Sequence, residues 1–185
     1  MFSECDILRS LELGSFKGDK IIDMSKMFYN CRGLPEFKLN LDCPKVETME
    51  SIFDGCKQLS TITMPKFSSG SLKSLKRAFA NCKELTSISI NLDTSNMAEV
   101  TDMSQMFYGN RLLKTVTITG DNSKMNGIGF TAENMEGIFE DCQSLETINY
   151  WGNENTFYFY KKDRKINSYL HYVFYIVELC THCNL

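Results

Sequence analysis

The sequence predicts an α/β solenoid of about six stacked helix–turn–strand units with a short parallel sheet, followed by a divergent C-terminal tail. A phenylalanine returns at intervals of 26, 25, 26, 28 and 32 residues. A cysteine follows it three residues later in five of six copies, and a leucine follows six residues later in every copy. We therefore number each position as a slot, counted from the phenylalanine of its copy. The repeat phenylalanines are Phe2, Phe28, Phe53, Phe79, Phe107 and Phe139.

The segment around each phenylalanine has helical spacing. Residues 24–31 place apolar side chains at i, i+3, i+4 and i+7, which form one stripe on a helix. The stripe consists of Met24, Met27, Phe28 and Cys31. Polar and charged residues stand between them, as a solvated back face requires. We therefore expect a short helix in each unit.

Beyond the leucine of slot +6, the apolar period changes from about four to two. Residues 59–64 and 85–90 end in alternating apolar and hydroxyl residues, several of them β-branched, which predicts a short strand. The repeat length falls in the range of roughly 20–29 residues that is typical of leucine-rich repeats. The longer intervals lie in polar stretches at 91–99 and 119–131, where loops are expected.

Three segments resemble a known repeat unit. Residues 22–31, 94–97 and 100–107 are similar to the TSNVTDMSxMFxxCxxLxxL unit of BspA-type leucine-rich repeats, which occur in bacterial surface proteins and mycoplasma lipoproteins. The resemblance covers residues 1 to about 150. It implies a cell-surface or secreted module for adhesion or interaction, with a protein or glycan partner on a host or neighbouring cell and no catalytic residues or cofactor. Asn110 in the cysteine slot and residues 72–75, which lack the usual Asp-Met, depart from the pattern.

Composition and the chain ends limit the function further. The net charge of −3 disfavours nucleic acid as a partner, and no apolar segment is long enough to span a bilayer. Residues 1–150 form the expected repeat domain, and residues 151–185 form the tail. The tail is interpreted as a cap on the last repeat, a non-native extension or a membrane-surface helix. Since Met1 immediately precedes Phe2, the first unit lacks most of its helix, and we expect the chain to be a piece of a longer protein or a product of gene decay.

Cysteine usage favours thiols over disulfides. Five of the eight cysteines occupy slot +3, and a column of equivalent thiols has no natural pairing. Bridges between adjacent units remain the alternative, and the state of Cys43 stays open. Cys180, His182 and Cys183 have metal-ligand chemistry but lack a second pair, so we expect no metal site.

The expected binding surface is the exposed face of the sheet, at slots +8 and +10. Its candidate residues are Glu12, Glu36, Lys38, Thr61, Thr63, Ser87, Ser89, Thr115, Thr117, Thr147 and Asn149. The simpler interpretation is that hydroxyl residues merely suit exposed strands. The sequence thus predicts a non-enzymatic interaction module. The alternatives are a structural spacer or a fragment of a longer surface protein and, from another class, a metal or redox site in the tail.

Overall fold

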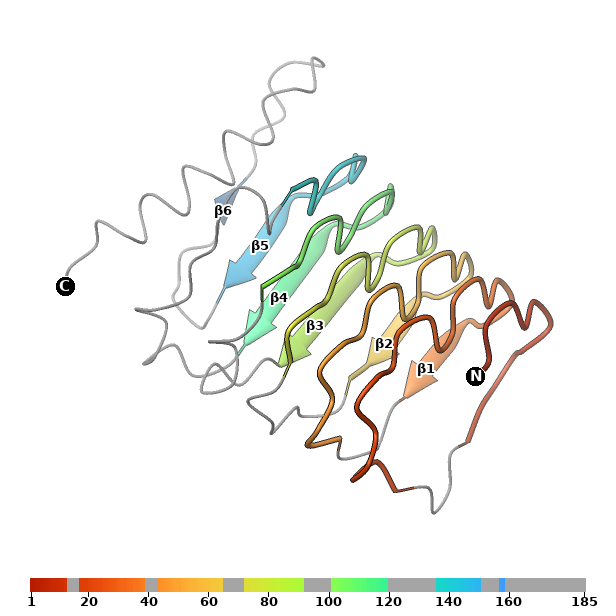
Figure 1. The fold of residues 1–185 in the computed structure, drawn as a ribbon. Coiled ribbons are helices and arrows are strands. Elements are labelled where there is room, and N and C mark those ends of the chain that lie inside the picture. The colour runs from red at the N-terminus through yellow and green to blue at the C-terminus, as the bar shows by residue number, and fades with distance from the viewer. Residues whose placement is uncertain are drawn as a thin grey trace.

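The computed structural model describes residues 1–12, 17–38, 43–64, 72–91, 101–119, 136–150 and 157–158. Each sequence repeat forms one rung, and successive rungs lie side by side along the molecule (Figure 1). A rung consists of a segment of tight turns around the repeat phenylalanine, a corner that follows slot +3, and a short strand.

The strands form two sheets. The first contains β1 (Glu36–Lys38) and β2 (Thr61–Thr63), which are parallel. The second contains β3 (Ser87–Asn91), β4 (Thr115–Thr119) and β5 (Thr147–Tyr150), also parallel, and β6 (Phe157–Tyr158), which is antiparallel to β5. Within each sheet, the slot +9 residues of neighbouring parallel strands pair with each other. Phe37 pairs with Ile62 in the first sheet, and Val116 pairs with both Ile88 and Ile148 in the second. The period-two alternation therefore predicted the strands correctly.

The predicted helices are wrong. No helix occurs in the part of the chain that the structure describes, so the fold is not an α/β helix–turn–strand solenoid. The physical reason is a left-handed residue at slots −2 and +2 of every rung from the second on, because a positive φ breaks an α-helix. In the second rung these residues are Lys26, with φ of 56°, and Asn30, also with φ of 56°.

A ribbon of turns replaces each helix. Within the second rung, the N–H of Met27 donates to the carbonyl of Met24, and that of Tyr29 donates to Lys26. The intervening N–H groups point to the next rung, where Phe28 donates to Ile52 over 2.9 Å. Alternate N–H groups thus close turns and join rungs, so the backbone is satisfied without a helix.

A polar residue at slot −5 begins the turn ribbon of the second to fifth rungs. Asp23, Thr48, Ser74 and Asp102 form a ladder of parallel bridges from rung to rung. The side-chain oxygen of this residue accepts the N–H two residues later, at 2.7 Å for Asp23 and 2.8 Å for Asp102. Ser74 makes the equivalent contact with Lys76 at 3.4 Å, so the residues that lack Asp-Met keep the same local turn.

Phenylalanine rings form the centre of the core. All five consecutive pairs are stacked, with centroids 5.4–6.0 Å apart and interplanar angles of 5–15°. Phe37 packs against both Phe28 and Phe53 in tilted geometry. Burial of one such ring stabilises the fold by roughly 2–3 kcal/mol, and each aromatic contact adds about 1 kcal/mol.

The buried thiols at slot +3 donate hydrogen bonds to the backbone of the preceding rung. The thiol of Cys56 donates to the carbonyl of Phe28 in the preceding rung over 3.0 Å, and Cys31, Cys82 and Cys142 make the same contact with their own preceding rungs. Burial raises the pKa of Cys56 and of Cys142 to about 12. These thiols are therefore protonated donors at neutral pH, and they are poor nucleophiles.

Candidate interaction surface

The predicted binding residues lie almost entirely on one face of the strands. We call the ten residues from β1 to β5 at slots +8 and +10 the sheet strip. They are Glu36, Lys38, Thr61, Thr63, Ser87, Ser89, Thr115, Thr117, Thr147 and Asn149. The apolar residue between each pair is buried, as Ile62, Ile88 and Val116 illustrate. The local alternation therefore places the polar residues opposite the core.

Strand register arranges the strip in two rows. In the larger sheet Ser87 pairs with Thr115 and Thr115 with Thr147, while Ser89, Thr117 and Asn149 form the second row. The amide of Asn149 donates to the hydroxyl of Thr117 over 3.3 Å. Adjacent strands are about 4.8 Å apart, so each row offers a regular series of donors and acceptors.

The first sheet carries the charged part of the strip. Glu36 pairs with Thr61, and Lys38 pairs with Thr63. Lys38 lies 3.8 Å from Glu36, and both side chains are about 60% exposed. Charges of this kind on an edge strand discourage pairing with another chain. The charges at this end therefore have a structural explanation as well as a binding one.

Glu12 is the one predicted residue that does not join the strip. It is exposed, but residues 8–12 form no strand, so it has no register with Lys38. The sheet hydrogen bonds also stop between β2 and β3, which belong to separate sheets. The strip therefore spans two sheets, whereas the sequence predicted a single short sheet.

A buried ionic network lies on the turn side of the rungs. Asp54 accepts from Arg77 Nε at 2.9 Å and from Asn81 Nδ2 at 2.8 Å, and its side chain is only 8% exposed. The guanidinium of Arg77 also lies 5.3 Å from the ring centre of Tyr108. We expected the recurring carboxylates to form a solvated face, and for Asp54 this expectation is wrong. Its partners are fully accounted for, so the network is structural.

The described residues contain neither a cluster of metal-ligand side chains nor a membrane-spanning helix. They include no group of three or more histidine, cysteine, aspartate or glutamate side chains that could hold an ion. Cys180, His182 and Cys183 lie outside the described residues. None of the described segments forms a helix that could cross a membrane.

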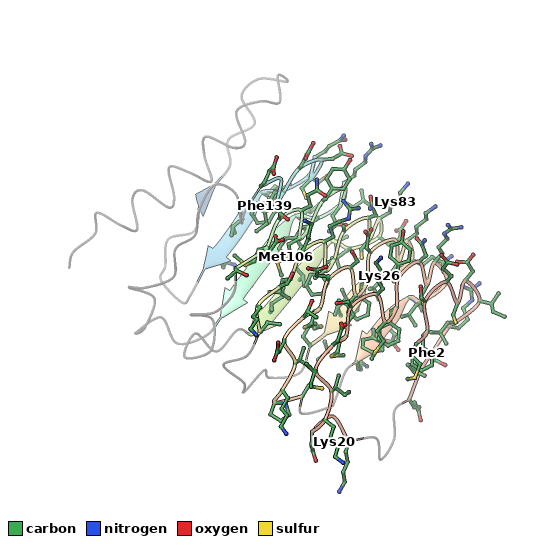
Figure 2. The ribbon with its side chains drawn as sticks, in the orientation of Figure 1. Phe2, Lys20, Lys26, Lys83, Met106 and Phe139 are labelled. Atoms are coloured by element: carbon green, nitrogen blue, oxygen red, sulfur yellow. The ribbon has the colours of Figure 1, made fainter. Side chains whose placement is uncertain are left out.

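Sequence analysis missed a second polar feature, at slot +4. Four successive rungs carry a cation there, and all four cations are exposed. They are Arg32, Lys57, Lys83 and Arg111. The repeated offset alone could have revealed them, because the slot is visible once the phenylalanines are aligned. Figure 2 places Lys83 far from Lys20, across the stack of rungs.

The repeat architecture described above has relatives among known proteins. Two overlapping stretches, residues 1–117 and 73–168, match a family described as "Mycoplasma protein of unknown function, DUF285". The chain belongs to this family. The predicted resemblance to a family of mycoplasma proteins is thereby confirmed.

No curated protein matches the chain. A solved structure that is similar to it is a leucine-rich cell-surface protein from Faecalibacterium prausnitzii A2-165. The two are 21% identical, with a TM-score of 0.37. The match covers 65% of this chain and 33% of that protein, so the chain spans about a third of its length.

Proposed function

We propose that this chain is a non-enzymatic interaction module of a surface repeat protein, and that the sheet strip contacts a protein or glycan on a host or neighbouring cell. Residues 1–150 form the module in this proposal, and it is displayed at the cell surface or secreted. Membership of a mycoplasma repeat family and likeness to a leucine-rich cell-surface protein support the surface location.

The observation that carries the proposal is the register of the strip. Polar side chains repeat at two positions per strand over adjacent rungs, and those of β1 to β3 are exposed. A partner can therefore make the same contact on successive rungs. Repeat proteins bind through such extended surfaces, because each rung adds a similar area.

Binding by one module should be weak. The strip contains no aromatic or arginine side chain, and these are the residues that dominate strong interfaces. A surface protein overcomes this through many copies, since the second contact of a linked array is intramolecular. We therefore expect measurable adhesion from a multivalent display of the chain.

The test compares two double variants of the whole chain coupled to beads. Thr63→Lys with Ser89→Lys places two bulky charges on the strip, and Ser3→Lys with Thr101→Lys places them on exposed positions outside it. Bead adhesion to cultured host cells and to immobilised matrix proteins should fall at least fivefold for the first variant only. If both variants adhere as well as the natural chain, the strip is not the binding surface, and the chain is better explained as a structural spacer.

A further inference from the structure

The cations at slot +4 recur on successive rungs, and we call them the basic row. It consists of Arg32, Lys57, Lys83 and Arg111, one from each of four successive rungs. Each residue follows slot +3 and is the first corner residue of a tight turn. The N–H of the slot +6 leucine closes this turn on the slot +3 carbonyl, at 3.2 Å for Leu34 and 3.1 Å for Leu59.

A backbone hydrogen bond joins two of these corners. The N–H of Glu84 donates to the carbonyl of Lys57 over 3.2 Å, which joins the corner of one rung directly to the next. The rings of the same four rungs follow each other in steps of 5.4, 6.0 and 5.8 Å. The positive charges therefore recur at about one rung spacing, because each is attached to an equivalent backbone position.

The two ends of the row differ from its centre. Arg32 lies 3.7 Å from Asp6, and Arg111 lies 2.9 Å from Asp141. Lys57 and Lys83, in the middle, are exposed and have no ion pair among the residues that the structure describes. The first and last rungs carry Asp6 and Gln143 at slot +4, so the row is limited to four cations.

We propose that the basic row binds a linear sulfated polysaccharide. A single narrow line of cations matches a single narrow chain that carries anionic groups at short intervals. The guanidinium groups can bind a sulfate through two parallel hydrogen bonds, and the lysines bind as point charges. The proposal does not depend on the sheet strip, because none of the four cations lies in a strand.

Nucleic acid fits the row less well. Bases are bound by stacking on aromatic rings beside a basic groove. The tyrosines nearest in sequence already pack with cations, since Lys26 lies 6.0 Å from the ring centre of Tyr29 and Arg77 packs against Tyr108. An anionic membrane is a broad surface, so it would meet the exposed Glu84 together with Lys83, whereas a narrow chain can follow the cations alone.

The experiment measures binding of the whole chain to a heparin oligosaccharide by titration calorimetry at two salt concentrations. Lys57→Gln with Lys83→Gln should weaken binding about tenfold and reduce its dependence on salt, because two counterion-releasing contacts are lost. Lys20→Gln with Lys45→Gln is the matched control. Both of these lysines are exposed, and the control changes the net charge equally.

Several results would overturn the proposal. It fails if the natural chain does not bind heparin, or if the control variant loses as much affinity as the row variant. It also fails if desulfated heparin binds equally well. Tighter, row-dependent binding of a single-stranded oligodeoxythymidine or of phosphatidylglycerol vesicles would assign the row to that other class of partner. A loss confined to the row variant and to sulfated chains supports the proposal.

Discussion

Asn110 occupies the one cysteine slot that lacks cysteine, and its side chain amide is inserted into the backbone network. Its Nδ2 donates to the carbonyl of Phe79 over 2.8 Å, the contact that a thiol makes in other rungs. Its Oδ1 also accepts the N–H of Cys82 at 2.8 Å. Elsewhere that N–H bonds to the phenylalanine of its own rung, as Cys56 does with Phe53. The slot thus requires a donor that reaches the preceding rung, rather than a thiol as such.

This requirement predicts different outcomes for two substitutions at Asn110. Asn110→Cys should leave the free energy of unfolding within about 1 kcal/mol, because a thiol can donate to Phe79 and Cys82 can bond as Cys56 does. Asn110→Leu should lower it by about 1–3 kcal/mol, since no side chain in this slot can then donate to the buried carbonyl of Phe79. Urea unfolding followed by circular dichroism measures both values. Equal stabilities would mean that the slot only needs to be filled.

At the scale of the element, the turn ribbon explains why sequence periodicity predicted a helix. The left-handed residues at slots −2 and +2 lie four positions apart within a rung, which is close to one helical turn. The ribbon therefore turns the same apolar slots inward as a helix does. Asn30, Gly55 and Gly109 at slot +2 are residue types that favour positive φ and carry a usable signal. Lys26 and Arg77 at slot −2 carry none, because neither side chain favours that conformation.

The sequence also predicted only part of the candidate surface. Strict alternation at Thr61–Thr63 and at residues 115–117 indicates which residues face away from the core, and the burial of Ile62 and Val116 bears this out. The break between β2 and β3 has no local signal, because it depends on how two rungs meet. The exposure of the basic row depends on the corner turn, which a helix prediction does not contain.

Gly55 provides a test of the ribbon. Its φ is 81°, and a Cβ added there would collide with Oδ1 of Asn30 in the preceding rung. Gly55→Ala should therefore lower the free energy of unfolding by about 2–3 kcal/mol, from left-handed strain and the collision together. Thermal and urea unfolding of the purified variant measure the loss.

A second substitution separates the two causes. Asn30→Gly removes the colliding side chain, and glycine tolerates the φ of 56° at that position. Combined with Gly55→Ala, it should restore about 1 kcal/mol or more relative to Gly55→Ala alone. A double variant as unstable as the single one would contradict the packing of Asn30 over Gly55.

At the scale of the whole molecule, the thiols form a column beside the stacked rings. Cys31, Cys56 and Cys82 occupy consecutive rungs and donate in one direction, each to the rung before it. Burial raises the pKa of all three thiols. The stability of the stack is therefore linked to the protonation of the column.

Alkaline pH should weaken the fold through this column. The pKa of Cys56 and of Cys142 rises from 9.0 to about 12 on folding, so the unfolded chain releases these protons first. Their contribution is complete below pH 9 and is lost as the pH rises toward 12, at roughly 1 kcal/mol per pH unit for each thiol. Urea unfolding at pH 8, 9, 10 and 10.5 gives the slope of stability against pH.

Cys56→Ser with Cys142→Ser is the control, because each hydroxyl can still donate to the carbonyl of the preceding rung but does not titrate in this range. The double variant should lose stability less steeply above pH 9, and slopes equal to those of the natural chain would show that other groups cause the alkaline loss.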